Sequence, residues 1–420
     1  MVYVLNINGQ PLMPTNRHGK VKHLLRDGKA KVVKRCPFTI KLLYETNNYT
    51  QDLTLGVDTG SGTFAMAVSR NNGDIVYLSE VILRNDITDK MTRRKEYRKK
   101  RRSYKTRYRK ARWLNRKNLK RKNRFSPTMV SKHHSHEKEI EYIKSILPIS
   151  KLILEMGQFD THLMKNPSLA NPKIKPWGYQ KGPNYGFEST KAMVLNRDNY
   201  TCQYCKGKHK DSKLEVHHII YRSNGGSNEE SNLITLCHTC HQDVHSGKIN
   251  LKTSGKIKGT LKYATQMNSI RIQLFRRYPE AIETFGYITK ANRLAFGINK
   301  EHYYDACVIA MGGKSFSIKC NLIKKRCVAD GDFRQTRGKR SEQKLPTGKI
   351  LGFRRFDKVK YLGKEYFIKG RKTTGYATLM DIDNNTIDFS YMPKGFKTPK
   401  IKNMIRIEAR KSWIIIETHI

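Results

Sequence analysis

Two Cys-x-x-Cys pairs restrict what the middle of this chain can fold into. Cys202 and Cys205 form the first pair, and Cys237 and Cys240 form the second. Four thiolates in this arrangement suit a closed tetrahedral zinc site, which holds together a module too short to build a large core. Residues 189–250 are therefore predicted to fold around a structural Zn²⁺, and chance pairing of buried cysteines is the alternative.

Polar residues with metal-binding or proton-transfer chemistry lie between and just after these pairs. They are His217, His218, Asn232, His241 and His245. Residues 214–220 are expected to form a strand, so the two adjacent histidines point to opposite faces. The last two are spaced i, i+4 and share one face of an expected helix. Phosphodiester hydrolysis needs an activated water and a Lewis acid, and this set offers groups for both. His209 and His238 are interpreted as surface residues.

Three acidic residues outside this module have similar settings. Asp58 ends an apolar strand expected at 53–58, and Glu155 ends another expected at 152–156. Asp305 lies on an expected helix at 301–311, one turn after His302. Such carboxylates, if they meet, form an oxygen-rich pocket for two Mg²⁺ ions. Considered alone, each acid is typical of a turn or a helix cap. His302 considered alone is typical of a capping or packing residue.

The charge of the chain points to a polyanionic partner. Its 83 Lys and Arg exceed its 35 Asp and Glu by 48, which favours nucleic acid. The excess peaks at residues 93–124, where nineteen of the thirty-two residues are basic. Absence of Pro and Gly there allows a long helix that orders against phosphates, and a disordered basic tail is the alternative. The arginines expected to contact nucleic acid are Arg98, Arg101, Arg102, Arg109 and Arg112.

The cysteine and histidine module resembles the HNH (ββα-metal) endonuclease motif. The resemblance implies that His217 binds a catalytic Mg²⁺ and that His218 is the general base. It further implies that Asn232 fixes the tautomer of that base through the other ring nitrogen. His241 would be another ligand of the metal, and His245 a further candidate.

The whole chain resembles the IscB family of transposon-associated, RNA-guided DNA endonucleases, which are related to the CRISPR type II effector. The order of strand with Asp58, Arg-rich helix, strand with Glu155, HNH module and His302-x-x-Asp305 carries this resemblance. It implies a multidomain α/β protein with a split RNase H-like (RuvC) domain, an inserted HNH zinc module, an Arg-rich bridge helix and a small C-terminal β-rich domain. Asp58, Glu155 and Asp305 would hold two Mg²⁺, and His302 would assist the attacking water.

The resemblance also predicts the domain boundaries. They are an N-terminal PLMP-type module at 1–50, RuvC segments at 51–90, 127–188 and 251–315, the bridge helix at 91–126, the HNH module at 189–250, and a domain reading a target-adjacent motif at 316–420.

The activity implied is cleavage of both strands of a DNA target that pairs with a guide RNA, called omega RNA. The HNH site would cut the guide-paired strand and the RuvC site the displaced strand. The protein would act as a monomer inside a ribonucleoprotein, in the cytoplasm of a prokaryote and at its nucleoid. No signal peptide or membrane span is expected.

Two other functions remain open from the sequence. A protein-only HNH homing or nicking endonuclease would explain residues 190–247 but not the strand-end acids. A non-catalytic basic RNA-binding protein with a structural zinc would explain the charge and the cysteines but not the histidines and Asn232.

Overall fold

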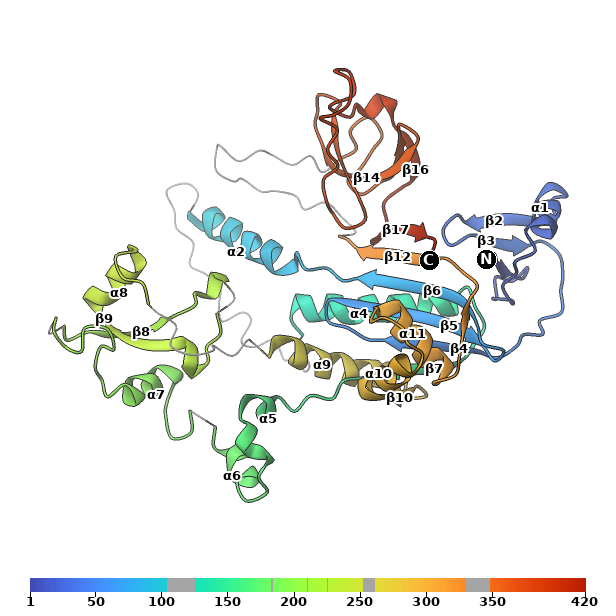
Figure 1. Ribbon diagram of the computed structural model, residues 1–420. Helices are drawn as coiled ribbons and strands as arrows, with labels where there is room; N and C mark the ends of the chain where they lie inside the picture. Colours follow the sequence, from blue (N-terminus) through green and yellow to red (C-terminus); the bar gives the residue numbers. More distant parts are fainter. Residues whose placement is uncertain (104–124, 183, 210, 225, 252–260, 330–347) are drawn as a thin grey trace. The chain divides into compact units, whose positions relative to one another are not determined.

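The computed structural model describes the chain except residues 104–124, 183, 210, 225, 252–260 and 330–347 (Figure 1). The chain forms two compact units. Unit 1 contains Met1–Gly157 and Ser269–Ile420, and unit 2 contains Gln158–Asn268. Within the described ranges, the helices are too short or too polar to span a membrane.

The centre of unit 1 is an eight-stranded sheet of order β10-β7-β4-β5-β6-β12-β17, with β11 beside β6. Strands β4, β5 and β6 form an antiparallel meander, while β7 runs parallel to β4 and β10 parallel to β7. The strands are β4 (Leu53–Asp58), β5 (Thr63–Arg70), β6 (Asp74–Ile82), β7 (Ile149–Glu155), β10 (Ile282–Thr284), β11 (Ser317–Ile318), β12 (Leu322–Cys327) and β17 (Trp413–Thr418).

Helix α11 (His302–Met311) packs closely on one face of this sheet. Its last six residues are buried, which explains why the segment is apolar around its circumference. Gly56 on β4 permits the approach, because a Cβ there would lie 2.4 Å from Ala310 N and 2.7 Å from Ala306 O. This contact fixes the start of α11 near the ends of β4 and β7.

Helix α4 (Pro127–Lys144) covers the opposite face. Leu78 of β6 packs with α11, so the alternate residues Tyr77 and Ser79 point the other way. Both hydroxyls donate to the Glu139 carboxylate on α4, at 2.8 and 2.9 Å. Lys325 of β12 completes this network with contacts of 2.7 and 2.8 Å to the same carboxylate. The sheet is therefore enclosed between helices, with a buried ion pair under α4.

Unit 1 contains two smaller sheets, one before the large sheet in sequence and one between its strands β12 and β17. The N-terminal module contains β1 (Tyr3–Leu5), α1 (His18–Arg26), β2 (Ala30–Lys34) and β3 (Thr39–Leu42), and Tyr3 Oη donates to Val76 O at 3.0 Å. The C-terminal domain is an antiparallel sheet of order β15-β14-β13-β16. Its strands are β13 (Lys358–Tyr361), β14 (Lys364–Arg371), β15 (Ala377–Met380) and β16 (Ile405–Glu408).

The expected boundary of the C-terminal domain is wrong at both ends. Strands β11, β12 and β17 lie within 316–420 but belong to the large sheet. The small sheet is thus an insertion between β12 and β17.

The basic helix α2 (Ile87–Ser103) begins earlier than expected and buries Tyr97, while Arg109 and Arg112 lie outside the described residues.

Unit 2 contains the cysteine and histidine module, preceded by short helices (Figure 1). Strands β8 and β9 form an antiparallel hairpin, and α8 follows β9 directly, which gives a ββα unit. The elements are α5 (Thr161–Lys165), α6 (Lys175–Gln180), α7 (Thr190–Arg197), β8 (Leu214–His218), β9 (Leu233–Cys237) and α8 (His238–His245). Two helices return the chain to unit 1, α9 (Lys262–Arg277) and α10 (Gly286–Ala295).

Candidate functional site

The four cysteines of unit 2 form a compact zinc site. Their Sγ atoms all lie within 4.8 Å of one another, and all four residues are buried. The Sγ atoms of Cys205 and Cys237 are 3.8 Å apart, which is the edge of a tetrahedron with Zn–S bonds of about 2.3 Å. Although burial raises the pKa of Cys205, the backbone N–H of His209 and neighbouring donors lower it to about 6, whereas burial raises the pKa of Cys237 to about 11 and also raises that of Cys240. The spacing and the chemistry of the four thiols, and not their pKa values, fit Zn²⁺.

His209 lies beside this site. It is exposed, as expected, but its Nδ1 is 3.5 Å from Cys240 Sγ and 3.7 Å from Cys237 Sγ. The imidazole of His209 contacts two of the thiols without being one of the four zinc ligands. The spacing of the cysteines in the sequence does not predict this contact.

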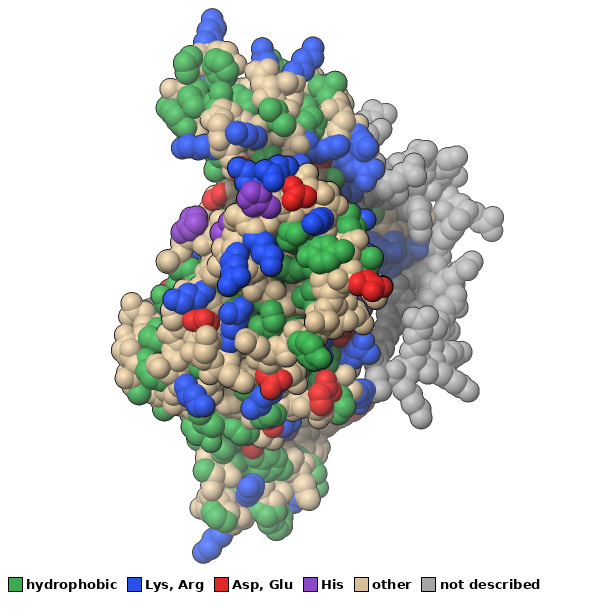
Figure 2. All heavy atoms as spheres, turned by 90° about the vertical axis from the view of Figure 1, so that its right-hand side faces the viewer, with side chains coloured by type: hydrophobic (Ala, Val, Ile, Leu, Met, Phe, Trp, Pro, Cys, Tyr) green, Lys and Arg blue, Asp and Glu red, His purple; other side chains and the backbone are tan. Residues whose placement is uncertain are grey.

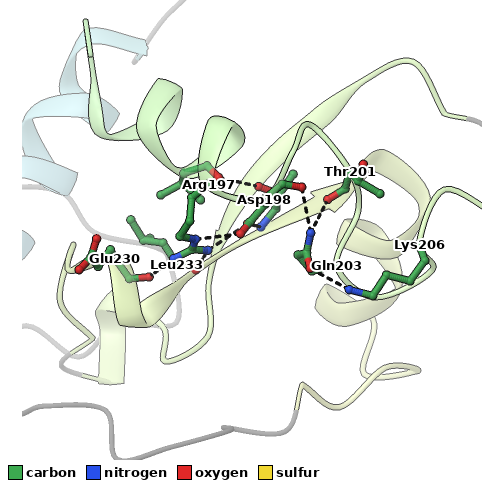
Figure 3. A network of polar contacts seen from close by, with 9 residues as sticks. Arg197, Asp198, Thr201, Gln203, Lys206, Glu230 and Leu233 are labelled. Atoms are coloured by element: carbon green, nitrogen blue, oxygen red, sulfur yellow. Dashed lines mark hydrogen bonds and ion pairs between the residues drawn. The ribbon is translucent and has the colours of Figure 1, made fainter. Parts of the chain in front are cut away.

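A polar network joins the zinc knuckle to β9 and α7 (Figure 3). Arg197 pairs with Asp198 through Nε at 2.8 Å and Nη2 at 2.9 Å, and it also donates to the Leu233 and Glu230 carbonyls. Asp198 Oδ2 accepts the N–H of Thr235 on β9 at 2.9 Å. Gln203, within the first cysteine pair, donates to Asp198 O. The knuckle and the hairpin are thereby held in one rigid arrangement.

Three histidines meet in the ββα unit, of which His217 is buried, His241 half-buried and His245 exposed. His217 is 3% exposed, and its ring centroid is 5.0 Å from that of His241 and 5.1 Å from that of His245. The ligand nitrogens of the three rings all lie within 4.8 Å of one another. Glu215 accepts from His241 Nδ1 at 2.7 Å, which orients that ring.

Electrostatics make this cluster suitable for a cation. Burial, followed by the charges of His241 and His245, lowers the pKa of His217 to about 4, so its ring is neutral at neutral pH and can act as a ligand. Its Nε2 is buried and has no hydrogen-bond partner in the described part of the chain. An unpaired buried nitrogen among three imidazoles fits a divalent metal ion.

His218 points to the other side of β8. It lines a hollow of about 590 Å³ together with Glu215, Arg222, Asn228 and other residues of unit 2. Its Nε2 is 2.9 Å from Asn228 Oδ1. The two adjacent histidines therefore have the opposite orientations predicted from the strand, one toward the cluster and one toward an open hollow.

Asn232 does not have the expected partner. Its amide is fully buried, accepts the N–H of Ile220 at 2.8 Å, and donates to the carbonyls of Ile220 and Ser227. The prediction that it bonds the ring of His218 is wrong, because its oxygen and nitrogen both bind the backbone of the loop between β8 and β9. Asn232 fixes this loop, and Asn228 contacts the ring.

The three acids Asp58, Glu155 and Asp305 belong to unit 1, whereas the ββα unit belongs to unit 2. Parallel pairing of β4 and β7 places Asp58 directly beside Glu155. His302, the first residue of α11, contacts Asp58 Oδ2 through Nδ1 at 2.6 Å. Asp305, one turn later, pairs with Arg293 Nε of α10 at 2.9 Å. His302 thus contacts one of the acids directly, which a residue that only caps or packs the helix would not do.

The three carboxylates are electrostatically strained. Burial raises the pKa of Glu155 to about 7; the Thr289 hydroxyl opposes this rise, and Asp58 and Asp305 add to it. Burial also raises the pKa of Asp58 and Asp305. Glu155 Oε2 is buried without a hydrogen-bond partner among described residues. Repulsion between these groups and an unpaired oxygen fit a bound cation.

These acids are more widely spaced than the other two clusters. Their oxygens do not all come within 4.8 Å of one another in the described structure, unlike the cysteine and histidine ligands. In a two-metal nuclease site the two ions lie about 3.5–4 Å apart. Carboxylates that bind both ions therefore need a wider spacing than the ligands of a single ion.

Lys and Arg side chains are scattered over the visible face among hydrophobic and other residues, with several acids between them (Figure 2). Helix α2 contains two of the described candidates, Arg98 and Arg102, and the side chain of Arg101 lies outside the described set. The basic residues of α2 outnumber its two acids, Asp89 and Glu96, and such an excess on one helix favours contact with phosphates. Residues missed from the sequence are Arg222 and Asn228, which contact His218 from the following loop, and Thr289 and Arg293, which contact Glu155 and Asp305.

Two family models match this chain, and the HNH match lies wholly within unit 2. Residues 202–247 match the HNH endonuclease family, and residues 2–182 match the RRXRR protein family. Anaredoxin of Nostoc sp. (strain PCC 7120 / SAG 25.82 / UTEX 2576) is 36% identical over 72 residues, which are 17% of this chain and 91% of that protein. The type IV methyl-directed restriction enzyme EcoKMcrA of Escherichia coli (strain K12) is 35% identical over 65 residues, 14% of this chain and 23% of the enzyme.

One solved structure is a distant neighbour. Streptococcus thermophilus Cas9 in complex with the AGAA PAM aligns with a TM-score of 0.34 and 12% identity. The alignment covers 58% of this chain and 32% of that one. A TM-score this low does not establish a shared fold.

Proposed function

Because this chain is an IscB-like protein that joins an RRXRR module to an HNH endonuclease domain, we propose that a guide RNA directs it to cut DNA at two sites. The observation that carries the proposal is that, besides the four cysteines, the chain has two separate candidate sites for a catalytic metal: the histidines of unit 2 and the acids of unit 1. A protein-only HNH nuclease needs the histidine set alone.

The acid site belongs to a RuvC-like nuclease of the RNase H fold. Support comes from the sheet order β6-β5-β4-β7-β10, with a three-stranded meander followed by two parallel strands. Asp58 and Glu155 end neighbouring central strands, and Asp305 and His302 begin the helix packed upon them. The chain enters and leaves unit 2 between β7 and β10, so the HNH module is an insertion in this domain.

In the HNH site, His217 and His241 hold one divalent metal ion, with His245 as a third ligand. When bound, the ion supplies Lewis-acid stabilisation at the scissile phosphate. His218 faces the hollow where a DNA strand can enter and takes the proton from the attacking water. Glu215 orients His241, and Asn232 fixes the loop that follows the base.

In the RuvC site, Asp58, Glu155 and Asp305 hold two Mg²⁺, which would stabilise the attacking and leaving oxygens. His302 contacts Asp58 and orients or deprotonates water on the displaced strand. Arg293 positions the Asp305 carboxylate, and Thr289 positions that of Glu155.

Guide RNA and double-stranded target DNA are the partners. The net charge of +48, the RRXRR match and the basic face of α2 support RNA binding. Base pairing supplies most of the specificity, and the C-terminal sheet reads a short motif beside the target. The working form is one protein chain in a ribonucleoprotein in the prokaryotic cytoplasm.

The test uses protein purified with its RNA and a target whose strands carry different labels. His218→Ala should abolish cutting of the guide-paired strand only, and Asp58→Ala cutting of the displaced strand only. RNA of defined size should co-purify, and its removal should stop both cuts. Cutting without RNA would favour a homing nuclease, and loss of both cuts in either single variant would refute the two-site assignment.

A further inference from the structure

The ring of His218 has a neighbourhood that determines which nitrogen carries its proton. Asn228 Oδ1 lies 2.7 Å from Arg222 Nη2 and 3.2 Å from Arg222 Nε. A guanidinium has only donors, so the Asn228 atom facing it is the amide oxygen and not the nitrogen. An amide oxygen only accepts hydrogen bonds. The orientation of Asn228 is therefore set by Arg222.

The same oxygen lies 2.9 Å from His218 Nε2. Because the oxygen accepts, Nε2 must donate, and the neutral ring then has its lone pair on Nδ1. Arg222 Nε lies 3.3 Å from His218 Nε2 as a donor, a contact that would require Nε2 to accept, but the same N–H can donate to Asn228 Oδ1 at 3.2 Å instead. The shorter contact to Asn228 decides the assignment, since a deprotonated Nε2 would place two acceptors 2.9 Å apart.

The loop between β8 and β9 builds this arrangement. Asn232 binds the backbone at Ile220 and Ser227, on either side of Arg222. Asn228 follows Ser227 directly, so both partners of the ring depend on the same fixed loop. His218, Arg222 and Asn228 all line the 590 Å³ hollow of the HNH unit.

We propose that Asn228, held by Arg222, is a positioning residue that keeps the proton of His218 on Nε2 and leaves Nδ1 as the base. The proton of the attacking water then moves to Nδ1 while the water oxygen bonds to phosphorus. The ester oxygen leaves with the electron pair of the broken P–O bond. This inference rests on the proposed HNH activity and assigns to Asn228 the role expected of Asn232.

The experiment compares Asn228→Leu, which removes the acceptor, with Asn228→Asp, which keeps it. Asn224→Leu in the same loop is the matched control, because its amide contacts the neighbouring Ser223 hydroxyl instead of the ring. Full ribonucleoproteins are assayed under single-turnover conditions with saturating Mg²⁺. Asn228→Leu should slow guide-paired-strand cutting by about 10–100-fold, with KM for DNA and displaced-strand cutting unchanged. The other two variants should stay within a few-fold of wild type.

A spectroscopic measurement gives a readout besides activity. Full-length protein labelled with ¹⁵N-histidine is recorded at a pH of about 8, where histidines are ordinarily neutral, and His218→Ala assigns the signal. We expect the proton on Nε2 in the wild type and a mixture of tautomers in Asn228→Leu.

Several results would overturn the inference. They are a wild-type proton on Nδ1, full cutting by Asn228→Leu, or equal losses in the Leu and Asp variants. Failure of wild-type protein to cut with its RNA would instead refute the proposed function, and the tautomer would still be read from the spectrum.

Discussion

Gly56→Ala should disable one nuclease site while leaving the other intact. The new Cβ would lie 2.4 Å from Ala310 N and 2.7 Å from Ala306 O, whereas ordinary contacts of a Cβ begin near 3.4 Å. Both clashing atoms are backbone in the middle of α11, so no side chain can turn away. The helix must retreat by about 1 Å, because packed interiors hold no spare volume.

That displacement acts directly on the acid site. His302 and Asp305 lie at the start of α11, while Asp58 and Glu155 stay with the sheet. Misplacement by 1 Å costs about 10²-fold in rate, and overpacking costs about 1–3 kcal/mol in stability. We therefore expect displaced-strand cutting to fall by about 10²-fold while guide-paired-strand cutting persists.

The assay uses the two-label target under single-turnover conditions, with thermal unfolding in parallel. Gly62→Ala is the matched control, since a Cβ there meets no atom within 4 Å. Normal displaced-strand cutting by Gly56→Ala would show that the packing of α11 on β4 does not set the acid geometry. Loss of cutting by the control to the same extent would refute the steric argument.

Three further predictions concern metal, pH and the buried ion pair. Metal analysis should find one tightly held zinc per chain before substrate is added, and its removal by a chelator should unfold the HNH module; an active zinc-free preparation would contradict this. Since the folded pKa of Glu155 is raised from 4.5 to about 7, metal-free protein should lose stability as pH rises through that window, and Mg²⁺ should restore it, as thermal melts can test. Glu139→Ala should cost about 3–5 kcal/mol in urea unfolding, because it leaves Lys325 buried without its counter-charge. The control Glu283→Ala removes a pair whose side chains are 28% and 25% exposed, so it should cost less than Glu139→Ala, and equal losses would refute the buried-charge argument.

The elements that hold the acids were predictable from local pattern. Apolar runs ending in Asp58 and Glu155 mark buried strands, and the structure gives β4 the expected bounds. A helix from 302 to 311 follows from its apolar content and its Gly312 stop. The cysteine pairs likewise predict their own cluster, because zinc chemistry fixes both the ligand type and the short spacing within each pair.

Contacts that depend on loop geometry were not predictable. Asn232 and Asn228 are both asparagines near the base, and only the path of the loop decides which one reaches the ring. Arg293 meets Asp305 because α10 and α11 pack side by side, which no local pattern encodes. The sequence of β12 resembles that of any short strand. Its pairing with β6, which lies more than two hundred residues earlier in the chain, could therefore not be predicted.

Both accessory modules begin and end within one continuous sheet. The HNH unit leaves after β7 and returns before β10, and the small C-terminal sheet leaves after β12 and returns at β17. Neither interrupts a strand, so ancestral genes could have acquired, exchanged or lost either one without disturbing the hydrogen-bond ladder of the host. An exchange of the HNH unit would therefore leave the pairing of β4 with β7, and with it the positions of Asp58 and Glu155, unchanged.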